Sequence, residues 1–147
     1  MKAAFLTGIG VFGAYVASFF GGWSASLTTL LIFMAFDYIT GLIVAGVFHN
    51  SPKTESGALE SHAGLKGLFR KFMTLVFVLV GHRLDLSMGT SYIRDAVCIA
   101  FIANELISLV ENAGLMGIPI PEVITNAIDI LSKKDGSTNT DTDNEEE

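Results

Sequence analysis

The stretch AAFLTGIGVFGAYVASFFGGWSASLTTLLIFMAF, residues 3–36, carries no formally charged side chain. A helix needs about 20 apolar residues to cross a hydrocarbon layer of about 30 Å, so this run is too long for one crossing and suits two. Within this run, the segment Gly21–Ser24 begins with a pair of glycines, which favours a break between two helices. The pattern predicts an integral membrane protein, whose backbone polar groups are satisfied within helices.

The composition agrees with a membrane protein. Of the 147 residues half are hydrophobic and 16% are charged, whereas soluble chains have about 25% charged residues. The net charge of −6 comes from six acidic side chains after position 134, so the rest of the chain is neutral. Cys98 is the single cysteine, which excludes an intrachain disulfide. No basic cluster with interleaved aromatic residues points to a nucleic-acid partner.

Residues 1–118 are predicted to form a small all-α bundle of four transmembrane helices. The expected segments are 3–20, 27–48, 72–88 and 92–110. The last two contain charges, each of which costs about 2.5–3.5 kcal/mol at the centre of a membrane helix. We therefore expect them to insert together as a hairpin; three crossings, with the fourth segment at the interface, is the alternative. A cleaved signal peptide is disfavoured, because one lysine precedes the first segment and apolar segments follow it at once.

The C-terminal part is predicted to lie outside the bundle. Residues 119–132 contain apolar side chains at helical spacing, which predicts a short amphipathic helix at the membrane interface. Residues 133–147 are polar and acidic, with little to bury, so we expect a disordered cytoplasmic tail.

The orientation follows from the basic residues. Lys66, Arg70 and Lys71 form a basic cluster beside a hydrophobic segment, which predicts a cytoplasmic loop before the third segment. With four crossings, both the N-terminus and the C-terminus are then cytoplasmic.

The first segment carries a stripe of small residues along one helical face: Gly10, Ala14, Ala17 and Gly21. Such a stripe lets two helix backbones approach closely in lipid. It serves either oligomerisation or packing against the next segment of the same chain.

Ionisable and polar side chains inside the predicted segments form a candidate intramembrane polar network. Its members are Asp37, Arg83, Asp85, Arg94, Asp95, Asn104 and Glu105. Charges at one depth neutralise one another, so we expect Arg83 to bridge Asp37 and Glu105, with the other charged members in a second layer. The network either lines a water-filled lesion after assembly or clamps the helices together. A proton relay through Asp37, His82 and Glu105 is a weaker alternative, because no inverted repeat is visible.

Other kinds of site have little support in the sequence. No nucleophile lies beside a plausible base, which argues against catalysis. The three histidines lack ligand partners at helical spacing, so neither a metal nor another cofactor is expected.

Several stretches, in order between about residues 20 and 131, resemble one family. They are Phe33–Gly41, Gly64–Lys71, Gly89–Thr90 with Ile93–Val97, Ile102–Asn112 and Gly117–Pro121. Together they are similar to the toxin-secretion/phage-lysis holins of phages and prophages of Gram-positive bacteria. Arg83 departs from the family pattern, in which an uncharged residue is expected.

This resemblance implies a non-enzymatic protein of the bacterial cytoplasmic membrane. It would oligomerise in the lipid bilayer and open lesions that release a cell-wall hydrolase (an endolysin) or a toxin, leading to host-cell lysis. A small ion or proton channel, or a transporter subunit, is the main alternative. A membrane adaptor that holds a soluble partner is a third.

Overall fold

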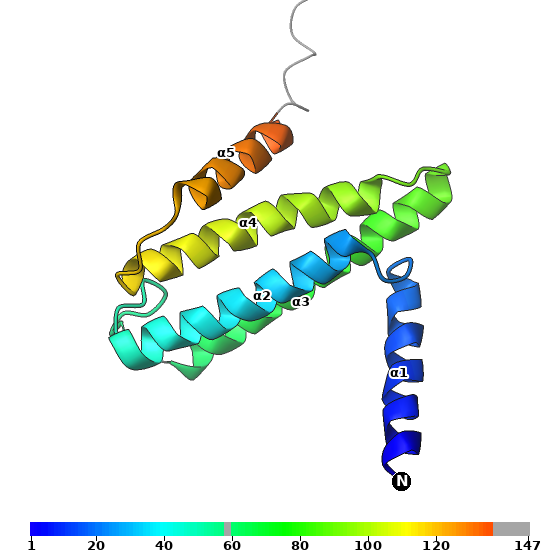
Figure 1. Cartoon of the computed structure of the whole chain (residues 1–147), viewed down its shortest axis with the longest axis horizontal. Helices are drawn as coiled ribbons and strands as arrows, with labels where there is room; N and C mark the ends of the chain where they lie inside the picture. The colour runs from blue at the N-terminus through cyan, green and yellow to red at the C-terminus, as the bar shows by residue number, and fades with distance from the viewer. Residues whose placement is uncertain (58–59, 137–147) are drawn as a thin grey trace, which may run out of the picture.

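The computed structural model describes residues 1–57 and 60–136, and helices are the regular secondary structure of this part of the chain. The elements are α1 (Lys2–Phe19), α2 (Ala25–Ile43) with its π-helical continuation η1 (Val44–Phe48), α3 (Ser61–Met88), α4 (Ile93–Leu115) and α5 (Glu122–Gly136) (Figure 1). Within the described ranges there are five α-helices and no strand, which confirms the predicted all-α class.

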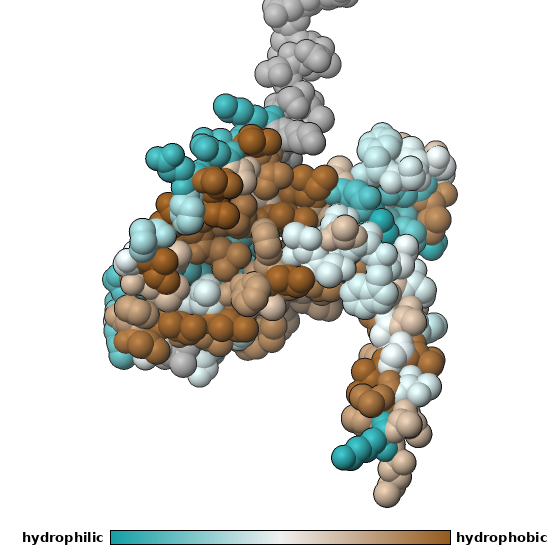
Figure 2. Space-filling view, in the orientation of Figure 1, coloured by the Kyte–Doolittle hydropathy of each residue, from teal (hydrophilic) through white to brown (hydrophobic). Residues whose placement is uncertain are grey.

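Helices α2, α3 and α4 form an elongated bundle in which α4 is the central element. Helix α4 contacts both α2 and α3 extensively, whereas α2 and α3 contact each other much less. The buried apolar core is small and consists of Leu27, Leu30, Met34, Val78 and Cys98. Large apolar side chains instead cover much of the outside; Phe36, Phe69 and Phe72 are each more than half exposed. Figure 2 shows this apolar surface along the bundle, with hydrophilic residues gathered on α5 and at the α3–α4 turn. An apolar exterior is typical of a protein surrounded by lipid.

Two of the described helices are long and apolar enough to cross a membrane: Lys2–Phe19, and α2 with η1 as Ala25–Phe48. Helix α1 projects away from the bundle at a steep angle (Figure 1), and Ala17 is its one buried residue. The chain turns between the two helices at Gly21 and Gly22, both with positive φ. Helix α2 then begins at a regular N-cap, where the Ser24 hydroxyl accepts a hydrogen bond from Leu27 N (3.1 Å).

The third helix is longer than the sequence indicated. It begins at Ser61, not at Phe72, so residues 61–71, which were predicted to belong to the preceding loop, are helical. Gly64 and Gly67 do not interrupt the helix; they lie against the ring of Tyr38 on α2. The apolar side chains of Leu65, Leu68 and Phe69 face outward at helical spacing. The packing of α3 against α2 thus outweighs the low helix propensity of the two glycines.

Helix α5 packs beside α4. Its observed range, Glu122–Gly136, includes the first residues of the segment predicted to be disordered, because the helix continues past Leu131. Ala127, Ile128 and Leu131 are half-buried, whereas Val123 and Ile130 remain exposed. The rest of the predicted tail, residues 137–147, lies outside the described residues. The interfacial role of α5 stays a prediction.

Candidate functional site: a buried ion cluster and its cavity

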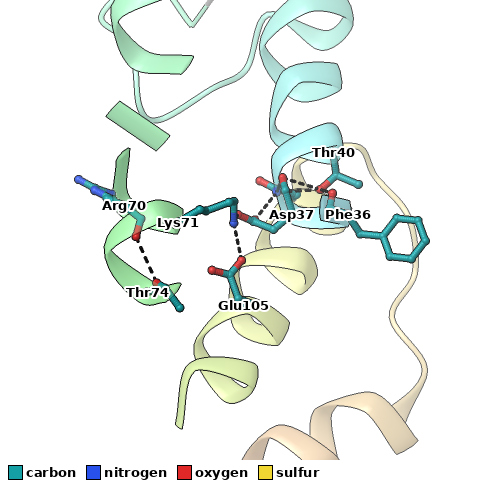
Figure 3. A network of polar contacts seen from close by, with 8 residues as sticks. Phe36, Asp37, Thr40, Arg70, Lys71, Thr74 and Glu105 are labelled. Carbon is teal, nitrogen blue, oxygen red and sulfur yellow. Dashed lines mark hydrogen bonds and ion pairs between the residues drawn. The ribbon is translucent and has the colours of Figure 1, made fainter. Parts of the chain in front are cut away.

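A largely buried lysine joins the three helices of the bundle. Lys71 Nζ of α3 donates hydrogen bonds to Asp37 Oδ2 of α2 (2.8 Å) and to Glu105 Oε2 of α4 (2.5 Å) (Figure 3). The three side chains are only 12%, 9% and 13% exposed, respectively. We call Asp37, Lys71 and Glu105 the ion cluster. With two carboxylates and one ammonium group, its formal charge is negative.

Asn112 of α4 donates a hydrogen bond to the carboxylate oxygen of Asp37 that Lys71 does not bind. Its Nδ2 lies 3.1 Å from Asp37 Oδ1, 3.3 Å from the Asp37 carbonyl oxygen and 3.0 Å from Thr40 Oγ1. The Thr40 hydroxyl donates to the carbonyl oxygen of Phe36 (2.8 Å). Both carboxylate oxygens of Asp37 therefore have donors, as a buried carboxylate requires.

Helical spacing explains how these residues meet. Glu105 and Asn112 lie two turns apart on one face of α4, and Asp37 and Thr40 lie one turn apart on α2. One sequence signal could have identified Asn112 as a member of the network: it lies on one polar helical face with Glu105 and Ser108. Lys71 was missed as a network member because it was assigned to a loop.

Arg83 does not bridge Asp37 and Glu105, which corrects the expectation from the sequence. It is exposed, and the bridging cation is Lys71. Because α3 begins at Ser61, Lys71 lies within the helix and reaches Asp37 and Glu105. Arg83 lies about 18 Å farther along the same helix at 1.5 Å per residue.

A second polar cluster lies at the α3–α4 turn and contains Asp85, Arg94 and Asp95. The buried Asp85 carboxylate accepts hydrogen bonds from Thr90 Oγ1 (2.6 Å), Ile93 N (3.0 Å) and Arg94 N (2.9 Å). It thereby satisfies backbone amides at the start of α4, which otherwise have no partner within the helix. Asp85 is a cap for the hairpin in this arrangement.

Arg94 connects the same cluster to the end of α1. Its Nη1 donates to the carbonyl oxygens of Phe20 (3.0 Å) and Gly21 (3.2 Å), and Arg94 also pairs with Asp95. Ser26 of α2 donates to Asp95 Oδ1 (2.8 Å). A cation at the last carbonyls of a helix is electrostatically favourable. These contacts hold the α1–α2 turn against the bundle.

A cavity of about 540 Å³ extends from the 51–54 segment of the loop to the ion cluster. All three bundle helices line it, and Asn104, otherwise exposed on α4, also faces it. Three of the seven charged lining residues belong to the ion cluster, and the others include Lys66 and Arg70. Charged side chains inside a membrane typically face such a water-accessible space or pair with one another. The ion cluster does both.

The small-residue stripe of α1 has an exposed half and a half that packs within the chain. A Cβ on Gly10 would meet nothing within 4 Å, and Ala14 is exposed. Ala17 is buried, and a Cβ on Gly21 would lie 2.7 Å from the His82 ring and 2.8 Å from Arg94. Packing within the chain therefore accounts for Ala17 and Gly21 but not for Gly10 and Ala14.

In the described part of the chain, no group of three or more His, Cys, Asp or Glu side chains is arranged to hold a metal ion. Lys66 and Arg70 are exposed near the loop, and the orientation inferred from them stays a prediction.

The chain matches the bacteriophage holin family over residues 14–133. An uncharacterized protein of Listeria monocytogenes is 38% identical over 92% of each chain. An uncharacterized 14.9 kDa protein of Clostridium perfringens is 37% identical over 86% of this chain and 92% of that protein. A probable holin of Bacillus phage phi105 is 31% identical over 78% of this chain and 81% of the phage protein. No solved structure matches significantly. The chain thus belongs to the bacteriophage holin family, a family of non-enzymatic proteins.

Proposed function

We propose that this protein is a holin that oligomerises in the bacterial cytoplasmic membrane and forms lesions that release a cell-wall hydrolase or a toxin. The observation that carries the proposal is the ion cluster, a charged interface between helices whose outer surface is apolar. Membership of the holin family supports it.

The ion cluster suggests how a closed subunit becomes part of a lesion. While α2, α3 and α4 stay together, Lys71 pairs with both Asp37 and Glu105. If the helices separate, each charge loses its partner, and an unpaired charge in lipid costs several kcal/mol. The charged faces of separated helices are therefore stable only in contact with water, not with lipid. An assembly that turns these faces toward a common aqueous centre would satisfy that condition.

Helix α1 is the part of the chain available for assembly. Gly10 and Ala14 lack partners within the subunit, and small residues permit close helix contacts in lipid. In the described conformation α1 is steeply inclined to the bundle (Figure 1), so both cannot run along the membrane normal. Four crossings therefore require α1 to swing about Gly21 and Gly22, because glycine has no Cβ and its backbone can adopt a wide range of conformations.

The test is induced expression in a bacterium, with and without a co-expressed cytoplasmic wall hydrolase. Culture density and membrane potential are followed together. A holin gives abrupt depolarisation, with lysis only when the hydrolase is present. Depolarisation without hydrolase release would refute lesion formation, and the absence of both effects would leave the adaptor interpretation.

A small ion channel is the second candidate, and the cavity is the observation that favours it. The cavity leads from the loop to the ion cluster, as an entrance to a charged binding site would. The two functions differ in the size of the solute that passes. A channel admits ions and excludes a folded reporter enzyme, whereas a holin lesion releases the enzyme.

A further inference from the structure

The loop end of the cavity is lined by cations that the ion cluster does not use. Lys53, Lys66 and Arg70 all line the cavity and are exposed. Across the described ranges the ion pairs are made by Lys71 and Arg94, so these three cations have no carboxylate partner within 4.0 Å there. Among the described residues that line the cavity, Glu60 is the one acidic residue outside the ion cluster, and it accepts a hydrogen bond from Ser56. The cavity mouth, defined as Lys53, Lys66 and Arg70, therefore attracts anions.

The start of α3 adds a second feature that favours an anion. Glu60 occupies the N-cap position, but its side chain accepts no capping hydrogen bond from the first amides of the helix, in contrast to Ser24 at the start of α2. Glu60 and Gly64 both line the cavity, so the first turn of α3 borders it. Backbone amides in the first turn of a helix lack intrahelical acceptors, and the helix dipole is positive there. A phosphate group satisfies both requirements.

The surface beside the cavity mouth distinguishes a lipid from a soluble anion. Leu65, Leu68 and Phe69 lie next to Lys66 and Arg70 in the sequence, and their side chains are 52%, 53% and 62% exposed. A soluble phosphate compound leaves this apolar surface in water, whereas the acyl chains of a phospholipid cover it. Basic residues between membrane helices on the cytoplasmic side recognise anionic headgroups by this combination.

We propose that the cavity mouth binds the headgroup phosphate of an anionic phospholipid, with the acyl chains along the apolar face of α3. The site rests on the proposed membrane placement, with the 49–60 loop at the cytoplasmic surface. Lys53, Lys66 and Arg70 supply the charge, and the first turn of α3 supplies backbone donors. Binding at this position would connect α2, α3 and the loop through the lipid.

The experiment is native mass spectrometry of the full-length protein released from detergent micelles. Dioleoyl phosphatidylglycerol, dioleoyl phosphatidylcholine and glycerol 3-phosphate are each added at equal concentrations. Each cation near the lipid surface contributes about 1 kcal/mol, so the double variant Lys66→Gln/Arg70→Gln should bind phosphatidylglycerol at least about tenfold more weakly. Arg83→Gln is the matched control, because it removes an exposed cation of the same helix that does not line the cavity. Its binding should equal that of the wild type.

Equal binding of phosphatidylglycerol by the wild type and the double variant would overturn the proposal. Equal binding of glycerol 3-phosphate and phosphatidylglycerol by the wild type would overturn the lipid assignment in favour of a soluble phosphate ester. If circular dichroism shows that the double variant is not folded, Lys53→Gln in the loop provides the decisive comparison. Lipid binding is measured without lysis, so a chain that binds phosphatidylglycerol but releases no hydrolase refutes the proposed function alone. A chain that releases the hydrolase without selective lipid binding refutes the lipid site alone.

Discussion

At the scale of single residues, both carboxylates of the ion cluster depend on one cation, Lys71. Lys71 is the shared partner of Asp37 and Glu105, and all three side chains are largely buried. Removing one partner from a buried ion pair is much more costly than replacing the pair as a whole, because it leaves an uncompensated charge. The lysine is thus the residue on which the association of α2, α3 and α4 depends most.

We predict that Lys71→Met lowers the stability of the folded protein by about 3 kcal/mol, since two adjacent carboxylates lose their common cation. Thermal unfolding in detergent, followed by circular dichroism, measures the change. Arg83→Met is the control, and it should leave the midpoint of unfolding nearly unchanged because Arg83 is exposed. Equal effects of the two substitutions would contradict the role assigned to Lys71.

Asp37→Leu and Glu105→Leu test the same interface in the membrane. Each removes a carboxylate and leaves Lys71 with one acidic partner, so the balance between closed bundle and hydrated assembly should shift. We expect altered timing of lysis while the protein still reaches the membrane fraction. Unchanged timing for both variants would argue that the cluster has no part in opening.

At the scale of elements, α1 differs from the other helices in having almost no partner within the subunit. Phe5 and Phe12 are 70% and 68% exposed, and Gly10 has open space around it. A substitution on α1 can therefore change association between subunits without disturbing the bundle.

We predict that Gly10→Leu weakens self-association of the protein, because the larger side chain prevents close approach of a second helix. Gly8→Leu is the matched control: Gly8 is equally uncovered but lies off the small-residue stripe. Chemical cross-linking in membranes measures the oligomers. If Gly8→Leu reduces cross-linking as much as Gly10→Leu does, the stripe is not the contact surface.

At the scale of the whole molecule, helix α5 lies outside the core of the bundle. The core of the bundle is built by α2, α3 and α4, while α5 packs on the outside of α4. The contacts of the described residues that hold the bundle together all lie before residue 137.

We expect deletion of residues 137–147 to leave membrane insertion intact and to change at most the timing of lysis. Fractionation followed by immunodetection measures insertion, and culture density measures timing. Loss of the protein from the membrane fraction would show that the acidic end has a role in targeting or folding. A full-length chain with the acidic residues of 137–147 replaced by their amides separates the effect of charge from that of length.

The sequence by itself determined the helical class and the two apolar helices, because both follow from local composition. The uncharged run 3–36 could form only helices in lipid, and the glycine pair at Gly21 and Gly22 located the turn. It also identified Asp37 and Glu105 as polar residues within apolar segments, since each interrupts a run of hydrophobic side chains.

The tertiary structure decided which cation pairs with them. That choice depends on where α3 begins and on how far it is shifted along α2 and α4, and neither quantity is encoded in local pattern. Helix α3 continues through Gly64 and Gly67, which lie against Tyr38 of α2. Because the helix is longer than predicted, Lys71 and not Arg83 reaches the two carboxylates. Ion pairing over a few ångströms is sensitive to such a shift, whereas hydrophobic periodicity is not.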